Sequence, residues 1–304
     1  MLAVMEEEQI LNVHEMGRHD DGLSAFAAVR PRLFGIAYRM LGSAAESEDI
    51  LQDVWMRWQT TNRDVVENSA AFLATTTTRL CINLIQSASS RHETYTGTWL
   101  PEPVDTSGDP TLGAEREEAL QLAVLVLLEK LPATERAAYV LREAFDYSYR
   151  EIAETLQIEE ANARQLASRA RKHLAEERRI VVDAKEQRRF LEAFINAAQR
   201  GDMAKLQNIF AEDVVSYSDG GGFVRAARVP VVGRERVARV IAAFASHFWL
   251  GVTLSWVHVN GRESILISRA EEPIGLVVTD ASDQGIHEIM WVMRPSKLSR
   301  MLTA

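Results

Sequence analysis

Hydrophobic residues recur at helical spacing through the first third of the chain. Between residues 23 and 92, apolar side chains return every three or four positions, which predicts amphipathic helices. They include Leu33, Ile36, Ala37, Met40 and Leu41, and then Ile50, Leu51, Val54, Trp55 and Trp58. Gly42 and Ser43 separate the first two helices, and the polar stretch 60–64 predicts a loop. A third helix is predicted from about Ser69, a candidate N-cap, to Ser90.

A second helical block covers residues 115–180. Its first apolar face consists of Leu120, Val124, Leu127, Leu128 and Leu131. Pro132 ends that helix, and residues 133–145 predict the next one. A short helix over 149–156, a turn at 157–159 and a longer helix over 160–177 then follow. This spacing is typical of a helix-turn-helix.

The last block, residues 184–304, changes from helical to alternating hydrophobicity. Helices are predicted at 185–199, 203–210 and about 235–248. Strands are predicted at 214–218, 223–232, 252–259, 264–269, 274–279 and 286–293. Helices gathered before a mostly antiparallel sheet indicate an α+β domain.

Between the helical blocks lies a segment rich in glycine and proline, residues 93–114, which predicts a linker. It contains the apolar pair Trp99-Leu100, which indicates docking on a neighbouring domain, either as simple anchoring or as a regulatory contact. We therefore expect a helical domain at 1–92, a linker at 93–114, a helix-turn-helix domain at 115–182 and an α+β domain at 183–304.

The composition excludes several classes of protein. The 304 residues are 47% hydrophobic and 25% charged, which is ordinary for globular domains. The net charge of −9 excludes a uniformly basic coat for nucleic acid, but not a local basic patch. The single cysteine, Cys81, excludes a disulfide framework and a cysteine-rich zinc site. Without a signal peptide pattern or a long apolar run, the sequence predicts a cytoplasmic protein away from the membrane.

The helix over 160–177 carries the clearest candidate chemistry. Polar residues lie off its apolar face, and Arg, Asn and Gln are the side chains that pair with base edges in the major groove. The candidates for reading bases are Asn162, Arg164, Gln165, Ser168 and Arg169. Arg171 and Lys172 are candidates for phosphate contacts, which position a protein on DNA. The alternative is a solvated basic helix face.

Two other segments indicate a function less clearly than this helix does. Asp49, Gln52 and Asp53 form a polar stripe, which is either a solvated helix face or a surface for docking another protein. The segment 219–222, Asp-Gly-Gly-Gly, predicts a turn with positive φ values but lacks the residues of a phosphate-binding loop. His258, His287 and Glu288 have no metal-ligand spacing, and no nucleophile and base can be paired. We therefore predict no catalytic residue, no metal and no cofactor.

Taken together, the motifs resemble extracytoplasmic-function (ECF) bacterial sigma factors over residues 23–300. The first block resembles sigma region 2 through Leu41-Gly42-Ser43, residues 48–55, Asn68, Ala71-Phe72-Leu73 and Arg79-Leu80. The second resembles region 4 through Leu131-Pro132, residues 149–153 and residues 168–171. The last block resembles a SnoaL-like domain of the NTF2 superfamily. With the segments 99–103 and 219–222, this points to the sigma-J-like subgroup, in which that domain follows region 4.

The resemblance implies a function and roles for particular residues. The protein would direct promoter-specific initiation by RNA polymerase and perform no chemistry itself. Asp49, Gln52 and Asp53 would dock on the clamp helices of the largest catalytic subunit, and region 4 would lie at the polymerase flap. The helix over 160–172 would read the −35 element. Residues implied at the −10 element are Asn62, Asn68, Arg79 and Asn83.

The resemblance also implies that the last domain contacts regions 2 and 4 and regulates them, in a chain expected to be monomeric. Candidates for this contact are Trp99, Leu100, Pro101, Asp219, Gly220, Gly221, Gly222 and Phe223. Whether the domain inhibits or assists stays open. Departures from the family pattern are Asn83 and Gln86 in the −10 helix, Phe223 after the glycines, and residues 294–298.

The rival hypothesis is enzymatic. NTF2-like domains resemble ketosteroid isomerases and polyketide cyclases, which use a cone-shaped pocket. Aromatic and histidine residues that could line such a pocket are Tyr217, Trp249, Trp256, His258 and Trp291. Ordinary core packing is the simpler interpretation of these residues, and a pocket that senses a small ligand is intermediate between the two.

Overall fold

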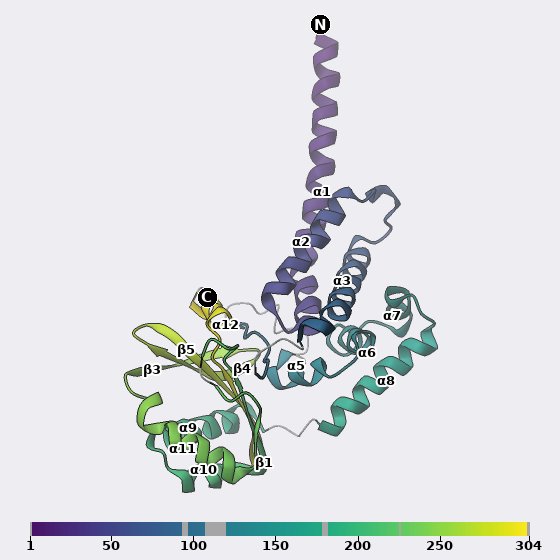
Figure 1. Cartoon of the computed structure of the whole chain (residues 1–304). Coiled ribbons are helices and arrows are strands. Elements are labelled where there is room, and N and C mark those ends of the chain that lie inside the picture. The colour runs from purple at the N-terminus through teal and green to yellow at the C-terminus, as the bar shows by residue number, and fades with distance from the viewer. Residues whose placement is uncertain (1, 93–96, 107–119, 178–181, 225, 303–304) are drawn as a thin grey trace.

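The computed structural model describes residues 2–92, 97–106, 120–177, 182–224 and 226–302. Its first part is a helical bundle of α1 (Leu2–Leu41), α2 (Ala44–Thr60), the short η1 (Arg63–Val65) and α3 (Ser69–His92). The start of α1 projects alone, away from the rest of the molecule (Figure 1). The sequence predicted helix only from residue 23, whereas α1 begins at Leu2 and continues through Pro31.

Local polar groups set the helix ends in this bundle. Gly42 has φ +63°, which ends α1, and the Ser43 hydroxyl then caps α2 by accepting a hydrogen bond from Glu46 N. At α3 the Asn68 carboxamide accepts from Ala71 N at 3.0 Å. Asn68 is therefore the N-cap of α3, whereas the sequence predicted Ser69, one residue later.

The second part contains α5 (Leu122–Glu129), α6 (Ala133–Tyr139), a π-helical turn η3 (Val140–Ala144), α7 (Tyr149–Leu156) and α8 (Glu160–Glu177). A reciprocal capping box between Ser148 and Glu151 starts α7, and Gln157 in the left-handed conformation ends it. The bounds of α7 and α8 agree with the predicted helix-turn-helix. The predicted helix over 133–145 is present as α6 followed by the π-helical turn.

The C-terminal part begins with α9 (Ala184–Arg200) and α10 (Met203–Ile209) and includes α11 (Arg234–Phe248), α12 (Pro295–Leu298) and η4 (Ser299–Leu302). Its strands are β1 (Phe210–Asp219), β2 (Val231–Val232), β3 (Val252–Val259), β4 (Arg262–Arg269), β5 (Glu272–Ser282) and β6 (Gly285–Val292). The sheet order is β2-β1-β6-β5-β4-β3; β1 and β6 are parallel, and the other neighbours are antiparallel.

One predicted strand is wrong. Among the described residues of 223–232, which exclude residue 225, only Val231–Val232 form a strand, at the edge of the sheet. Phe223 and Val229 are 76% and 70% exposed, so their hydrophobicity does not mark a buried strand face. Gly221 and Gly222 have positive φ values, as predicted, and turn the chain away from β1.

The two faces of this sheet bury different partners. On one face, α9, α10 and α11 pack against residues such as Ile267, Val277 and Ile289 (Figure 1). The other face packs on Leu100 from the linker and Leu122 from α5. This curved, mostly antiparallel sheet with helices on one side is the expected α+β domain.

The two helical parts share one hydrophobic core. A single buried cluster runs from Phe26 in α1 to Leu174 in α8. The boundary at 93–114 stays a prediction, because residues 107–119 lie outside the described part of the chain. Within the described residues, no helix has the length and hydrophobicity to cross a membrane, and no cluster of His, Cys, Asp and Glu could hold a metal.

Candidate nucleic-acid interface and interdomain junction

Helix α8 presents a polar face to solvent. Ala163, Ala170 and Leu174 are buried against the other helices, in agreement with the predicted inward face. Every candidate DNA-reading or phosphate-contacting residue of this helix is exposed: Asn162, Arg164, Gln165, Ser168, Arg169, Arg171 and Lys172. The arrangement fits a helix that enters a DNA groove.

Neighbouring groups hold several of these cations in place. The Arg164 guanidinium lies 4.9 Å from the centre of the Tyr149 ring and 3.2 Å from the Glu160 carboxylate. Arg171 is paired with Glu143 at 2.5 Å, and this hydrogen bond raises the pKa of the Arg171 guanidinium. The positive face is therefore ordered before DNA arrives, although its charge is partly neutralised.

The predicted −10 residues surround the loop between α2 and α3. Asn62 and Asn68 are exposed, and each carboxamide caps the turn that follows it. Asn83 is exposed farther along α3. A nearby cavity of about 580 Å³ has walls that could receive an unstacked base and its phosphate. It is lined by Arg57, Thr60, Thr61, Ala71, Phe72, Thr75, Thr76 and Arg79.

Arg79 lies in an arrangement that sequence reasoning missed. Its Nε donates to Thr155 O at 2.8 Å and its terminal nitrogen donates to Glu154 O at 3.3 Å, at the C-terminal end of α7. One turn earlier on α3, the Thr75 and Thr155 hydroxyl oxygens are 3.3 Å apart. The predicted −10 helix is thus bonded directly to the helix-turn-helix.

The acidic stripe on α2 is open to solvent. Asp49, Gln52 and Asp53 are exposed, while Ile50 and Val54 on the opposite face are buried. The structure therefore leaves this surface available to a protein partner.

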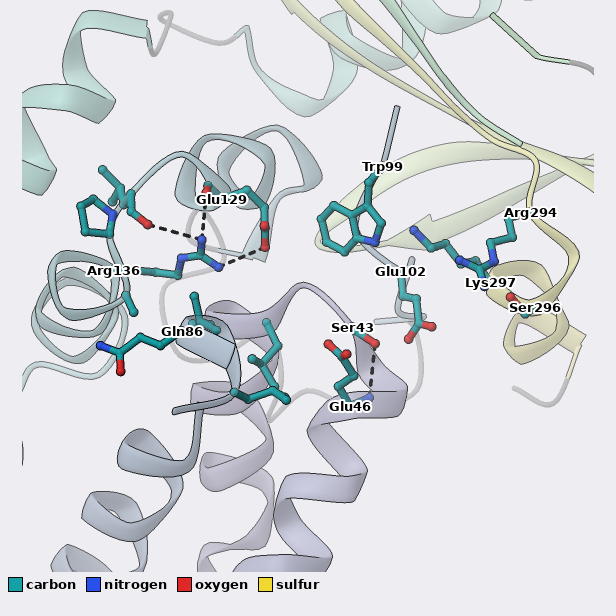
Figure 2. Close-up of a pocket in the computed structure, with 16 residues that line it drawn as sticks. Ser43, Glu46, Gln86, Trp99, Glu102, Glu129, Arg136, Arg294, Ser296 and Lys297 are labelled. Carbon is teal, nitrogen blue, oxygen red and sulfur yellow. Dashed lines mark hydrogen bonds and ion pairs between the residues drawn. The ribbon is translucent and has the colours of Figure 1, made fainter. Parts of the chain in front are cut away.

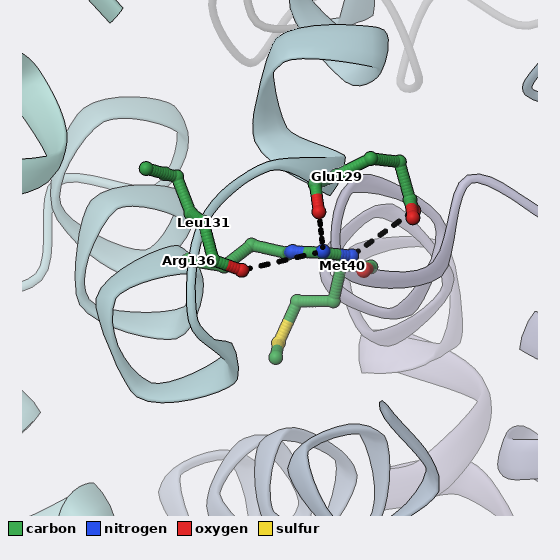
Figure 3. Close-up of polar contacts among 4 residues, drawn as sticks. All are labelled: Met40, Glu129, Leu131 and Arg136. Carbon is green, nitrogen blue, oxygen red and sulfur yellow. Dashed lines mark hydrogen bonds and ion pairs between the residues drawn. The ribbon is translucent and has the colours of Figure 1, made fainter. Parts of the chain in front are cut away.

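Arg136 joins the two helical parts at their centre. Its side chain is buried and donates to Met40 O at 2.6 Å, to the Glu129 carboxylate at 3.0 Å and to Glu129 O at 2.9 Å. Figure 3 shows the guanidinium enclosed by these groups and Leu131. Burial lowers the pKa of Arg136, and Glu129 opposes that effect. The carbonyl of Met40, at the end of α1, is thereby held on α6.

The linker is held on the first helical bundle through its Trp99–Glu102 segment. A Cβ atom at Gly42 would lie only 2.7 Å from the Trp99 ring, so glycine permits this close approach. Glu102 N donates to Gly42 O at 2.7 Å, and the Glu102 carboxylate accepts from Ala45 N at 2.9 Å. The Tyr38 hydroxyl donates to Glu102 O at 2.5 Å.

The same linker residues are bound from the other side by the C-terminal domain. The Asp219 carboxylate accepts from Leu100 N at 3.0 Å and from Lys297 Nζ at 2.7 Å. Lys297 also donates to Leu100 O and lies 4.5 Å from the centre of the Trp99 ring. Both charged side chains are buried, at 4% and 0% exposure, and this burial lowers the pKa of Lys297. We call Trp99, Leu100, Asp219 and Lys297 the linker latch.

Asn260 ties all parts of the molecule together. Its carboxamide donates to the Tyr38 hydroxyl at 2.7 Å and to Leu120 O at 2.9 Å, and accepts from Val104 N at 3.0 Å. Asn260 has φ +53° in the turn between β3 and β4, which lets it reach all three partners. Removal of this single side chain would break contacts with α1, the linker and the segment before α5.

A cavity of about 730 Å³ lies where the three parts meet. Figure 2 shows Trp99 and Lys297 on one side of it and Glu129 and Arg136 on the other. Of the predicted regulatory residues, Pro101 and Gly220 are also buried, whereas Gly222 and Phe223 are exposed and do not line this cavity. Phe223 lies beside Arg294, whose guanidinium is 5.8 Å from the centre of its ring.

The aromatic residues of the enzymatic hypothesis do not gather in one pocket. Trp249 and Trp291 line a cavity of the C-terminal domain, but Tyr217, Trp256 and His258 do not. Tyr217 packs on the opposite sheet face, Trp256 lies under Arg188 and His258 lies beside Thr106. The described side chains that line this cavity include no titratable residue that could act as an acid or base.

A Ser-His-Asp arrangement is present at the β5–β6 turn. His287 Nε2 lies 2.7 Å from Ser282 Oγ, and its Nδ1 lies 3.0 Å from the Asp213 carboxylate. The Ser282 hydroxyl also accepts from Gln284 N at 3.1 Å, and both Ser282 and His287 are buried. These residues do not line the domain's cavity, so the arrangement closes a hairpin turn.

Known proteins with matching sequences are sigma factors. The Sigma-70 region 2 family matches residues 25–91, and the Sigma-70, region 4 family matches residues 121–174. The ECF RNA polymerase sigma factor SigJ of Mycobacterium tuberculosis is 35% identical over 235 residues, which cover 76% of this chain and 75% of that protein. A probable ECF RNA polymerase sigma factor, SigI of the same species, is 32% identical over 287 residues, or 93% and 97%.

A solved structure of a relative supports the same family. The crystal structure of M. tuberculosis SigJ superimposes with a TM-score of 0.74 at 31% identity, and covers 91% of this chain and 98% of that one. The agreement extends over the helix-turn-helix, the region 2 bundle and the C-terminal domain. Because SigJ and SigI are more than 30% identical to this chain over most of its length, the chain belongs to the ECF RNA polymerase sigma factors, which act in transcription initiation.

Proposed function

We propose that this sigma factor reads the promoter −10 element with the α2–α3 loop and α3, and the −35 element with α8. Asp49, Gln52 and Asp53 dock on the clamp helices of the largest polymerase subunit, and region 4 lies at the flap. The exposure of these side chains supports the assignment. The ordered cations of α8 and the cavity beside Arg79 supply the chemistry for duplex and unstacked DNA, respectively.

We further propose that the conformation described above is inactive. The observation that carries this proposal is the direct bonding of α3 to α7, through Arg79 to Thr155 O and Thr75 to Thr155. The two promoter elements are about 25 base pairs apart, or about 85 Å at 3.4 Å per base pair. With α3 bonded to α7, the helix that precedes α8 in the helix-turn-helix, α3 and α8 cannot reach elements that far apart, so region 4 must leave region 2 before both elements are bound.

The C-terminal domain holds this closed conformation. The linker latch and Asn260 bind the linker to both the region 2 bundle and the sheet, so region 4 cannot separate while the linker stays docked. The domain therefore inhibits through the linker, and release of the latch permits initiation. Each of these contacts stabilises the closed state and so adds to the free-energy difference between the closed and open states.

Run-off transcription with bacterial core polymerase tests both statements. The template is a promoter selected from a random library, and the proteins are the full chain, a chain ending at Val182 and a chain ending at Arg294. The last variant lacks Lys297 but keeps all six strands, whereas an end near Glu288 would cut the central strand β6. We expect the chain ending at Arg294 to transcribe severalfold more than the full chain.

The outcomes separate the two parts of the proposal. Failure of every variant to bind core polymerase or to transcribe would overturn the assignment of the DNA-reading and docking surfaces. Equal transcription by the full chain and the chain ending at Arg294 would overturn inhibition by the latch alone. The chain ending at Val182 reports whether the domain has an additional assisting role.

A further inference from the structure

The C-terminal domain encloses an apolar cavity of about 380 Å³ between the sheet and α11, on the face opposite the linker. Among the residues that the structure describes, its lining includes no charged side chain. The residues are Ser216, Ser218, Ala226, Ala227, Val231, Val240, Ile241, Phe244, Phe248, Trp249, Trp291 and Met293. A cavity of this volume lies within the range of sites for small organic molecules.

Aromatic rings form one wall of the cavity. Phe248 and Trp249 have ring centres 5.0 Å apart at an interplanar angle of 88°, and Phe248 and Trp291 are 5.9 Å apart, also at 88°. Phe244 at the rim is 50% exposed, which is unfavourable for a large hydrophobic side chain in water. The wall offers both ring faces and ring edges to a planar hydrophobic guest.

Two hydroxyl groups lie on the β1 side of the cavity. Ser216 and Ser218 alternate along β1 and both face inwards. Neither hydroxyl makes a hydrogen bond to another residue in the described part of the chain. An ion would be costly here, because none of the described lining residues carries an opposite charge. The matching ligand is neutral and largely aromatic, with an oxygen or nitrogen atom for the serines.

The ends of β1 and β6 contribute to the cavity wall on one face of the sheet and to the linker latch on the other. In β1, Ser218 faces the cavity and its neighbour Asp219 faces the linker, where it binds Leu100 N. Met293, which lines the cavity just after β6, donates its N–H to Asp219 O at 2.8 Å. A guest in contact with Ser218 and Met293 therefore stiffens the strand ends that hold the latch.

We propose that this cavity binds a neutral aromatic small molecule and that its occupancy tightens the linker latch. The second half of the proposal rests on the inhibitory role of the latch argued above. In this proposal the ligand binds the docked state better, because the cavity residues Ser218 and Met293 are joined to Asp219, which Leu100 and Lys297 hold in that state. Occupancy thus favours the closed, inactive sigma factor.

The binding half is tested with the full chain and a pair of probes, 2-naphthol and 2-naphthoate, by isothermal titration at neutral pH. We expect 2-naphthol to bind and the charged 2-naphthoate to bind at least about tenfold weaker. Val240→Trp fills the cavity from the partly exposed rim and should abolish binding. Val232→Trp adds the same side chain at an exposed position outside the lining and should leave binding intact.

A second variant guards against misfolding of the first. Phe244→Lys places a charge at the half-exposed rim, where the ammonium group reaches water, and should weaken 2-naphthol binding while preserving the circular dichroism spectrum. Absence of 2-naphthol binding, or binding that survives both rim variants, would overturn the ligand site. The transcription of the full chain without probe is measured separately, so this failure leaves the sigma function intact.

The coupling half is tested by hydrogen exchange of the Leu100 amide, which donates to Asp219. Saturating 2-naphthol should slow this exchange by about fivefold or more, the lower end of ordinary coupling between sites, and should lower run-off transcription by a similar factor. Val240→Trp should show neither effect. Binding with unchanged Leu100 exchange would overturn the coupling and leave only the site.

Discussion

At the scale of single residues, buried polar groups hold the domains together. Asp219, Lys297, Arg136, Asn260 and Tyr38 are all buried, and each has hydrogen-bond partners on another part of the chain. Burial raises the pKa of the Tyr38 phenol, which stays a neutral donor and acceptor between Glu102 and Asn260. Such groups add specificity to an interface because each becomes costly when its partner leaves.

The latch ion pair should behave as a coupled unit. Asp219→Asn leaves the buried Lys297 ammonium group without its counter-charge, and loss of one partner of a buried pair costs about 3–5 kcal/mol. Lys297→Met added to Asp219→Asn removes that charge, so the double variant should recover most of the loss. Urea unfolding of the four proteins measures the cycle, and additive losses would contradict the coupling.

The capping box of α7 should give the helix-turn-helix a response to acid. Hydrogen bonds from the Ser148 hydroxyl and backbone N–H lower the pKa of Glu151 below its ordinary value of 4.5. Its stabilising effect is therefore complete above that pH and is lost as the pH falls through the lower folded-state pKa. The difference in urea midpoint between the native protein and Glu151→Gln should shrink below about pH 4.5.

A matched control separates the cap from general acid effects. Glu154→Gln removes an exposed carboxylate from the same helix, outside the capping box. Its midpoint should differ from that of the native protein by an amount that changes less with pH. Equal pH dependence of the two differences would argue against the capping assignment.

At the scale of elements, we predict that α8 divides into base-reading and phosphate positions. Arg164→Ala in the holoenzyme should lose discrimination at one −35 position, by about 1–3 kcal/mol. Lys172→Ala should weaken binding evenly across sequences and reduce the salt slope by about one. Binding to a library randomised at the −35 element, at several salt concentrations, measures both. Identical sequence preference and salt slope for the two variants would refute the division.

Elements with local signals were predictable from the sequence. The bounds of α7 and α8 follow from a serine cap, a polar turn and an apolar face, all within thirty residues. The segment 223–232 misled because hydrophobic and β-branched residues indicate a strand, whereas here they are exposed beyond a glycine turn. The helix before residue 23 carried no apolar periodicity that predicted it.

The candidate site was only half predictable. Trp99 and Leu100 were recognised because an apolar pair in a linker indicates docking, whereas Asp219 was named only through the resemblance to the sigma-J-like subgroup. Lys297 belonged to a noted motif, but nothing in its neighbours predicts burial against a residue 78 positions away. Tyr38 and Asn260 are 222 positions apart, and their hydrogen bond has no signature along the chain.

At the scale of the whole molecule, the closed conformation is one continuous structure from α1 to α12. Regions 2 and 4 share a hydrophobic core, and the linker lies between that core and the sheet. Release therefore requires several contacts to break together, since Arg136 joins the two helical parts, the latch joins the linker to the C-terminal domain, and Asn260 joins that domain to α1 and the linker. We expect a two-state switch in place of graded loosening.

A reversible crosslink tests whether opening is required. The Thr75 and Thr155 hydroxyl oxygens are 3.3 Å apart, so Thr75→Cys with Thr155→Cys should form a disulfide between α3 and α7. The oxidised double variant should lose run-off transcription, and dithiothreitol should restore it. Cys81 does not interfere, because it is buried and burial raises its pKa.

Each single-cysteine variant is the control for oxidation itself. Thr75→Cys and Thr155→Cys alone should transcribe equally before and after oxidation. Full transcription by the crosslinked double variant would show that regions 2 and 4 need not separate.

The sheet face beneath the linker has a consequence for the lifetime of the active protein. When the linker leaves, Val259, Leu266 and Val292 lose their cover, and the edge strand β3 loses its bridge from Asp105. An uncovered hydrophobic face beside an open strand edge favours aggregation and recognition by proteases. A sigma factor that opens without binding polymerase would therefore be degraded quickly. This degradation would limit how long transcription continues after a signal.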